Sequence, residues 1–448
     1  MIPENIKQKT LKKIFIKYIL LLSVFIFVLL LLPSCNTTEP TSNASIILTS
    51  EDASCTEAWL NLKVHNITLP TNIKIVGNDS TILNTRINSN DTTLYVNNLL
   101  PNKTYSIQTI VESTNLKSNS VSVTTMDTTT HNFTWQTFTF GGGRGSSYLN
   151  DVAIINENDI WAVGEIHTAE TDQFDSNGVW INPYNAVHWD GLKWELRRIG
   201  SGYGNPYHTV YAFNENDVWF DGTVQWDGTR YTAHTNNFPL EPNGDGWRVN
   251  AMWGTSSKDF YVVGNGGNIA HYNGNSWEKI ESGTKTLISD VWGINNRITS
   301  EDEVYCAVSS YFSVPGGNDK KILKITNRNK VEEINWDTDR NVATVWAKSD
   351  FQIYTGGDGV FENKTGVWRG IKFGVNNYTN KVRGSALNNI FVVGGFGFVA
   401  HFNGIGWQVF SEIKLNDGNY TSVSIRNKII AISGFDGNKA IIVINKQK

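Results

Sequence analysis

The sequence predicts an all-β protein, in which a β-sandwich is followed by a seven-bladed β-propeller that an N-terminal strand closes. Three observations lead to this fold class. The 448 residues include 39 Gly, 16 Trp and 16 Tyr, and the apolar residues form short alternating runs rather than a helical period. Seven related segments also recur along the chain. Gly164 ends the first and Gly434 the last, and these 270 residues over six steps give a mean spacing of 45, which is typical of propeller blades.

Residues 1–35 have the features of an export signal rather than of a folded domain. Lysines between positions 7 and 17 precede an apolar run, 18–32, which is short for a membrane span and has the length of a signal-peptide core. The run ends in Leu32-Pro33-Ser34-Cys35, which resembles the lipobox of bacterial lipoproteins. The resemblance implies cleavage before Cys35 and acylation of its thiol, so that lipid chains hold the protein on a membrane. The alternative is a plain secretory signal followed by an unrelated cysteine.

Location and partners follow from the same region and from the charge. Asn36 follows the cysteine, and by resemblance to enterobacterial lipoproteins a residue other than aspartate there implies the outer membrane. The expected location is therefore the bacterial cell envelope, on either side of that membrane. Residues 36–43 are polar and form a short tether. A net charge of -4 with 18% charged residues gives no electrostatic footprint for nucleic acid, and no motif calls for a cofactor.

Residues 44–130 are predicted to form the sandwich, because they contain short alternating strands. The segment 99–105, Leu-Leu-Pro-Asn-Lys-Thr-Tyr, resembles the tyrosine corner of fibronectin type III domains, and 119–125 resembles the last strand of that family. Trp59 is the candidate for the family's core tryptophan. The resemblance implies a spacer domain. Cys55 and Cys306 fall in different predicted domains, so a disulfide between them is not favoured.

Residues 131–448 are predicted to form the propeller from four-stranded units. The repeated segments are 159–164, 217–222, 259–264, 303–308, 352–357, 390–395 and 429–434. An Asn-Gly or Asp-Gly pair follows the third strand at 190–191, 227–228, 273–274 and 403–404, which predicts two-residue hairpin turns with positive φ at both positions. The aromatic residue beyond the turn is expected to pack between neighbouring units, as at Trp194, Trp277 and Trp407.

The ends of the repeat region predict how the ring closes. The last unit has three strands and then the chain ends, whereas Thr134–Phe140 has the pattern of a fourth strand without partners before it. We therefore expect this segment to complete the seventh unit and leave no open edge. The string 253–283 resembles repeats of bacterial secreted propellers related to the Asp-box, sialidase-like and photosystem-assembly-factor-like groups, with a degenerate Asp-box. That resemblance implies a fold, and such folds carry unrelated functions.

Few residues suggest catalytic or metal chemistry. His188, His271 and His401 occupy the same position in different units, so they are expected to be structural rather than a metal set. No helical pattern follows the glycine strings, which excludes a phosphate-binding loop, and no GxSxG, HExxH or CxxC pattern occurs. Asp337, Asp339 and Asn341 resemble the start of a calcium loop but lack its glycine and distal glutamate, so a plain acidic turn is the alternative.

The longest insertions, 165–184, 197–208, 238–248 and 309–320, all fall in loops that leave a propeller on one face. They contain an aromatic and amide-rich set that suits a sugar ring or a protein. The candidate ligand-binding residues are Trp180, Tyr184, Tyr203, Tyr207, His208, Trp247, Tyr311 and Phe312. The alternative is that these are ordinary variable loops whose aromatic rings pack internally.

The function predicted from these observations is non-catalytic recognition of an envelope protein or glycan by the long-loop face. One alternative is a hydrolase or lyase acting on extracellular polysaccharide, like sialidase-type propellers, with carboxylates from several blades. Another is an envelope assembly scaffold. An enzyme is expected to bring carboxylates and arginines together at the funnel mouth, whereas a binding protein is expected to present aromatic residues without such a cluster.

Overall fold

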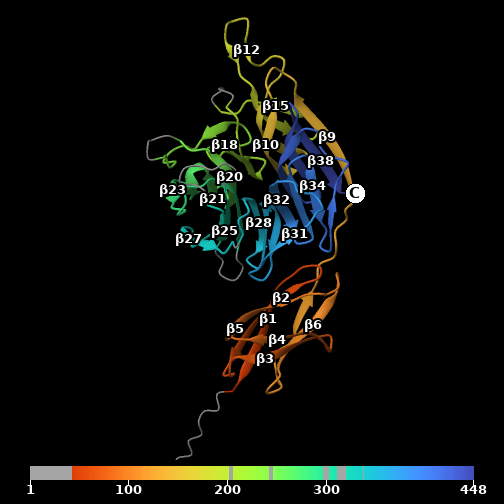
Figure 1. Cartoon of the computed structure of the whole chain (residues 1–448). Helices are drawn as coiled ribbons and strands as arrows, with labels where there is room; N and C mark the ends of the chain where they lie inside the picture. The colour runs from red at the N-terminus through yellow and green to blue at the C-terminus, as the bar shows by residue number, and fades with distance from the viewer. Residues whose placement is uncertain are drawn as a thin grey trace, which may run out of the picture.

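A computed structural model describes residues 43–200, 205–241, 246–295, 302–309, 319–336 and 338–447. The regular secondary structure of those residues is almost entirely β-strand, and the strands form two parts (Figure 1). The smaller part, coloured red to orange, lies below a larger assembly of sheets coloured yellow to blue. Over the described ranges, no helix has the length and hydropathy needed to cross a membrane.

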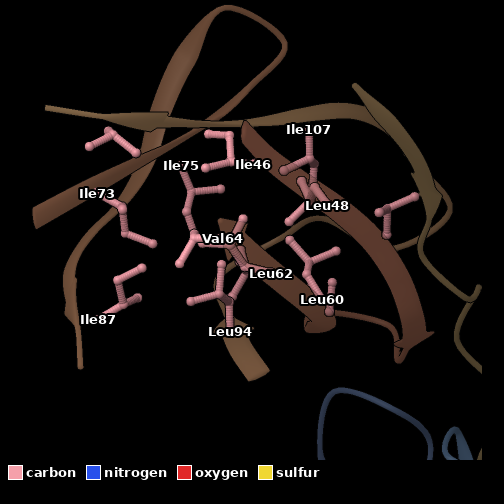
Figure 2. Close-up of a cluster of buried hydrophobic side chains, with 14 of the residues drawn as sticks. Ile46, Leu48, Leu60, Leu62, Val64, Ile73, Ile75, Ile87, Leu94 and Ile107 are labelled. Carbon is pink, nitrogen blue, oxygen red and sulfur yellow. The ribbon is translucent and has the colours of Figure 1, made fainter. Parts of the chain in front are cut away.

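The smaller part consists of two antiparallel sheets packed face to face. One sheet contains β1 (Ser45–Ala53), β2 (Ala58–His65) and β5 (Asp91–Val96). The other contains β4 (Ser80–Ile87), β3 (Thr71–Gly77), β6 (Thr104–Val111), β7 (Leu116–Lys117) and β8 (Val121–Thr124). Alternate residues of both sheets point inward and share one apolar core, in which Leu62 and Ile75 are fully buried (Figure 2). The part is therefore a β-sandwich.

Two residues that the sequence singled out in the sandwich have different roles. The Tyr105 hydroxyl accepts a hydrogen bond from the Leu100 backbone N–H at 2.9 Å, which is the contact that a tyrosine corner makes. Trp59 is also buried, at 1% exposure, but its indole N–H donates to the Lys364 carbonyl of the larger part at 3.1 Å. The Lys364 ammonium group in turn lies 2.8 Å from Glu57. Trp59 therefore joins the two parts rather than filling the sandwich core.

The larger part contains seven four-stranded antiparallel sheets among the described residues, numbered here in chain order. Sheet 1 has β10 (Tyr148–Asn156), β11 (Asp159–Ile166), β14 (Tyr184–Trp189) and β15 (Trp194–Arg197). Sheet 2 has β16 (Val210–Asn214), β17 (Asp217–Phe220), β18 (Val224–Trp226) and β19 (Tyr231–Ala233). Sheet 3 has β20 (Val249–Ser256), β21 (Asp259–Gly264), β22 (Ile269–Tyr272) and β23 (Trp277–Ile280), with a short 3-10 turn η1 (Asn265–Gly267).

The remaining sheets repeat this order. Sheet 4 has β24 (Ile288–Asn295), β25 (Asp302–Val308), β26 (Lys321–Thr326) and β27 (Lys330–Ile334). Sheet 5 has β28 (Val342–Ser349), β29 (Gln352–Gly357), β30 (Gly359–Asn363) and β31 (Trp368–Ile371). Sheet 6 has β32 (Thr379–Ala386), β33 (Asn389–Gly394), β34 (Phe398–Phe402) and β35 (Trp407–Val409). Sheet 7 has β36 (Gly418–Arg426), β37 (Ile429–Asp436), β38 (Lys439–Gln447) and β9 (Phe133–Gly141).

The turn between the third and fourth strands differs from the predicted two-residue hairpin. Trp189 pairs with Trp194, so four residues form the connection, and of Asp190 and Gly191 only the glycine has positive φ. The Asp190 carboxylate instead accepts hydrogen bonds from the backbone N–H groups of residues 192 and 193. The equivalent side chains at 227, 273 and 403 accept the same pair of bonds. The Asx side chain, rather than a pair of left-handed residues, closes the turn.

Aromatic rings beyond these turns pack against the preceding sheet, as predicted. Trp194 contacts Phe138 and Phe140 of sheet 7, with ring centroids 5.8 and 5.7 Å apart. Trp277 donates its indole N–H to the carbonyl of His234, just beyond sheet 2, and Trp407 packs on Phe373, just beyond sheet 5. The repeated sequence therefore joins sheets 1, 3 and 6 to the sheet that precedes each of them.

The repeated histidines are structural in all three sheets. His188 stacks on Trp161 at 4.0 Å between centroids and lies 2.9 Å from Asp159. His271 and His401 make equivalent contacts. They stack on Tyr261 and Phe391 and lie 2.6 and 3.0 Å from Asp259 and Asn389. In each case the third strand is tied to the second by one ring contact and one hydrogen bond.

Hydrogen bonds between first strands link the sheets side by side. Six of the first strands carry a register shift that leaves one extra residue, a β-bulge. In five cases the side chain of this residue reaches the backbone of the next sheet or, for Asn150, of the loop just before it. The bonds run from Asn150 to the Tyr207 carbonyl, from Asn250 to that of Ile288, from Ser289 to that of Ala343, from Asn380 to that of Tyr420 and from Thr421 to that of Leu149. The last bond joins sheet 7 to sheet 1.

The N-terminal strand β9 completes sheet 7. All nine of its residues pair with β38, from Phe133 opposite Gln447 to Gly141 opposite Lys439, although about 300 residues separate the two strands in the chain. Figure 1 shows orange β9 beside blue β38. The pairing is the one expected for Thr134–Phe140. The pairing provides hydrogen-bond partners for the backbone groups along the edge of β38, and it attaches the linker from the sandwich to the last sheet.

Replacing Thr421 with valine tests the bond between sheets 7 and 1. Valine keeps the shape but removes the hydroxyl that donates to the Leu149 carbonyl at 2.7 Å, so this acceptor loses its partner. We expect the free energy of unfolding to fall by about 1 kcal/mol in a denaturant titration. The exposed Thr365→Val is the matched control and should have no measurable effect. Equal unfolding free energies for the T421V and wild-type proteins would contradict the proposed contribution.

A second prediction concerns pH and the buried pair of His131 and His401. Their Nδ1 atoms lie 2.9 Å apart. Burial, and next His131, lowers the pKa of His401 to about 3, and burial also lowers the pKa of His131. The pKa of an unfolded histidine is about 6.5. Between about pH 3 and 6.5, the unfolded chain therefore binds more protons than the folded chain does. The free energy of unfolding therefore falls as the pH drops through that window.

Between pH 7 and pH 5, we expect His401 to account for a loss of about 2 kcal/mol in the free energy of unfolding. The His401→Gln variant should be less stable than wild type at pH 7 and should lose less stability on acidification. Denaturant titrations at the two pH values measure both effects. An unchanged pH dependence in the variant would show that His401 is not responsible.

Candidate functional site

The longest connections among the sheets lie on one face, here called the long-loop face. It carries the links from second to third strands and from fourth to first strands, such as 167–183 and 281–287. The opposite face, here called the short-loop face, carries tight turns such as Glu157–Asn158 and the Asx turns. The sandwich contacts the short-loop face, because Trp59 and Glu57 bond to Lys364 in a turn of sheet 5. The insertions therefore lie on the side away from the sandwich.

A hairpin within the first long loop projects from this face. It consists of β12 (Gln173–Phe174) and β13 (Trp180–Ile181), and it lies at the end of the molecule opposite the sandwich (Figure 1). The Asp175 carboxylate closes its turn by accepting the N–H groups of Asn177 and Val179, both at 2.8 Å, and Gly178 has a φ of 76°. The hairpin is thus a defined structure rather than an irregular loop.

The tip of the hairpin exposes apolar side chains. Phe174 and Trp180 lie opposite each other on the two strands, and their rings meet edge to face with centroids 5.1 Å apart. Phe174 is 67% exposed, Val179 61% and Trp180 45%. Sequence reasoning found Trp180 but missed Phe174. The Asp-Ser-Asn-Gly turn at 175–178, flanked by residues with strand preference, was the signal that could have revealed the pair.

Tyr184 fixes the base of the same loop. The Arg198 guanidinium lies 3.8 Å from the centre of the Tyr184 ring, and its Nε donates to the Asn182 carbonyl at 2.9 Å. The Tyr184 hydroxyl donates to Glu170, and this hydrogen bond, with burial, raises the pKa of Tyr184. Tyr184 therefore positions the hairpin, whereas Trp180 is presented by it.

The other candidates within the described residues are packed. Tyr207 lies against Phe220, and burial raises its pKa to about 12. His208 is held by Asp221, which accepts its backbone N–H at 2.8 Å. Trp247 is 8% exposed and stacks on Phe238, with its indole N–H donated to the Pro239 carbonyl. These rings form separate local contacts, so the structure does not bring them together with Trp180 into one platform. A ligand-binding role for them stays a prediction.

Several predicted residues lie outside the described ranges, namely Cys35, Tyr203, Tyr311, Phe312 and Asp337. Two residues of the suggested calcium set use backbone groups in other contacts. The Asp339 carbonyl accepts a hydrogen bond from the Lys320 ammonium group, and the Asn341 backbone N–H donates to the Asp358 carboxylate. In the part of the chain with assigned positions, no group of three or more His, Cys, Asp or Glu side chains is arranged to hold a metal ion. Cys55 and Cys306 are both buried free thiols.

The inner strands surround a small pocket of about 170 Å³ to which six of the seven sheets contribute. The lining residues Lys381 and Arg383 belong to the bonds between sheets, because both bind Asp290. The Asp290 carboxylate is fully buried and receives both arms of Arg383, at 2.7 and 2.8 Å, and Lys381 at 3.1 Å. Burial alone would raise the pKa of Asp290, but Arg383 and Lys381 hold it well below its ordinary value.

Asp151, the acidic residue that lines this pocket, is engaged in the same way. It accepts the hydroxyls of Thr209 and Ser422 and the N–H of Val210, which come from the two neighbouring sheets. Carboxylates and an arginine therefore do lie close together near the axis. The hydrogen bonds of Asp151, Asp290 and Arg383 join neighbouring sheets, however, and are not directed toward a ligand. This arrangement fits a structural role better than general acid–base catalysis.

Comparison with known proteins identifies the fold of the larger part. No protein-family model matches the sequence, and no curated protein matches it. Among solved structures, one described as YCF48 bound to D1 peptide superposes with a TM-score of 0.52 at 14% identity, covering 72% of this chain and 97% of that one. The WD40 β-propeller domain of Doa1 gives a TM-score of 0.50 at 12% identity, covering 71% and 98%. The larger part is a β-propeller. At these identities the likeness extends to the fold alone.

Replacing Arg198 with lysine tests how the hairpin is held. Lysine keeps the charge but loses the planar group that stacks on Tyr184 and the Nε–H bond to Asn182. We expect faster amide hydrogen exchange and faster proteolysis within 165–184, with the global unfolding temperature nearly unchanged. Arg197→Lys, at the exposed neighbouring position paired with Glu195, is the control. Equal exchange in both variants would argue against this anchoring role.

Proposed function

We propose that this protein is a recognition module that binds a protein partner through the long-loop face of its propeller. The observation that carries the proposal is the exposed pair of Phe174 and Trp180 at the tip of a structured hairpin. Large aromatic rings held at low conformational entropy are the side chains that contribute most to protein interfaces. Exposing large apolar side chains to water is unfavourable, and such exposure on an ordered hairpin is typical of a surface that a partner covers.

The charge of the hairpin suggests what the partner is like. Residues 165–184 contain Glu165, Glu170, Asp172 and Asp175 but no lysine or arginine. A basic protein surface would complement this field and would approach faster than a neutral one. The projecting shape favours a protein over a sugar ring, which binding proteins usually enclose in a concave site. The similar propeller described as YCF48 bound to D1 peptide is a precedent for peptide recognition on such a scaffold.

The remaining architecture fits a tethered receptor. We take the seven sheets as the blades of a seven-bladed propeller and the sandwich as a fibronectin type III-like domain, in keeping with the Tyr105 contact. We further propose that acylated Cys35 anchors the chain in the bacterial cell envelope, at the outer membrane. Because the sandwich precedes the propeller and contacts its short-loop face, the hairpin would then point away from the membrane.

The test compares capture of envelope proteins by three forms of the soluble chain that begins at residue 41. The double variant Phe174→Ser/Trp180→Ser removes the exposed pair, and Leu192→Ser removes a side chain that is 89% exposed in a turn of sheet 1 on the short-loop face. A partner identified with the wild-type chain and then purified should bind the double variant about thirtyfold more weakly, a loss of about 2 kcal/mol. The L192S control should bind as wild type does.

Equal affinity of the double variant and wild type for that partner would overturn the assignment of the hairpin as the recognition element. Retention of an envelope polysaccharide, rather than a protein, by the wild-type chain and its loss in the double variant would favour the glycan alternative.

A further inference from the structure

A second pocket lies where the sandwich meets the propeller, on the face opposite the hairpin. Its volume is about 440 Å³, which is within the range of small-molecule sites. Glu51 and Asp52 at the end of β1 form its sandwich wall. The propeller wall comes from the short-loop ends of sheets 4, 5 and 6, including Trp292, Trp346 and Asp350. Neither part forms the pocket alone.

Aromatic rings and carboxylates dominate the lining. Trp346 of β28 occupies the position that Trp292 has in β24, since each pairs with a tyrosine of the second strand of its sheet. Phe351 adds a third ring. The carboxylates of Glu51, Asp52 and Asp350 outnumber the one lysine, Lys348, which is exposed. Arg383 packs over Trp292, but its charge is balanced by the Asp290 carboxylate that it binds.

Trp346 also has a polar atom that the protein leaves unused. The residue is 1% exposed, and its indole N–H has no hydrogen-bond partner among the described residues. The equivalent N–H of Trp292 donates to the Ala347 carbonyl at 3.0 Å. The ring edge of Trp346 formed by Cη2, Cζ2 and Cε2, the last of which is bonded to Nε1, lies against Gly384, and both residues line the pocket. A buried N–H without an acceptor costs about 1–3 kcal/mol, so a ligand that supplies one would recover that free energy.

We infer that this junction pocket binds a small organic cation, an amine or guanidinium compound that also carries a hydrogen-bond acceptor. Trp292 and Phe351, which are both partly exposed, provide aromatic rings for the cation, and Glu51 and Asp350 provide opposite charge from the two walls. The acceptor receives the Trp346 N–H. Because both parts form the walls, the ligand also holds the sandwich against the propeller. The site is separate from the proposed partner-binding face.

Calorimetric titration of the intact soluble chain tests the proposal with three probes. L-argininamide carries a guanidinium group and a carboxamide oxygen, and agmatine lacks that oxygen. N-acetyl-L-citrullinamide, called citrullinamide below, replaces the guanidinium with a neutral urea and has no free amine, so it carries no positive charge. We expect argininamide to bind most tightly and to change tryptophan fluorescence, agmatine to bind more weakly, and citrullinamide not to bind at millimolar concentration. Failure of both cations to bind at that concentration, or equal binding of citrullinamide, would overturn the proposal.

Variants locate the site. Glu51→Gln/Asp350→Asn removes one carboxylate from each wall and should weaken argininamide binding at least about tenfold, whereas the exposed Glu412→Gln should leave it unchanged. Trp346→Phe removes the indole N–H and should weaken argininamide but not agmatine. Thermal melts of each variant without ligand establish that it is folded. Unchanged argininamide affinity in the folded double variant would place the binding elsewhere.

Discussion

The structure depends on closing a ring of sheets whose first strands are joined by hydrogen bonds. A four-stranded sheet cannot bury both faces by itself, so each sheet needs a neighbour on either side. The bulge residues supply the connection in five cases, because the extra residue of the first strand turns a side chain such as Asn250 toward the next sheet. The Thr421 hydroxyl links sheet 7 to sheet 1, and β9 forms the fourth strand of sheet 7.

This closure determines where function resides. The short-loop face is used for assembly, since its Asx turns form the hairpins and its turns in sheets 5 and 6 receive the sandwich and the linker. Over the part of the chain that the structure describes, the long-loop face does not contact the sandwich, so insertions there change the surface without disrupting the contacts between sheets. The β12–β13 hairpin is the clearest example. The junction pocket is the exception on the short-loop face, because it arises where two folded parts meet.

Much of the fold was predictable because the sequence patterns that specify it are local. The 45-residue period, the fourth-strand pattern of 134–140 and the tryptophans beyond the turns each depend on a few neighbouring residues. The turn geometry was predicted wrongly, because Asn-Gly suggested backbone φ values whereas the Asx side chain makes the closing bonds. The site was less predictable. Burial of Trp247 and the docking role of Trp59 depend on contacts with Phe238 and Lys364 that single-strand patterns do not reveal.

Amide hydrogen exchange of the whole chain, followed by mass spectrometry, tests the closure most directly. If β9 is an integral strand of sheet 7, peptides covering 133–141 exchange as slowly as peptides covering 439–447 and open together with them, because the two segments belong to one cooperative unit. Fast exchange in 133–141 beside slow exchange in 439–447 would contradict the account, since β9 would then be a loosely attached linker and the ring would be open at its seventh sheet.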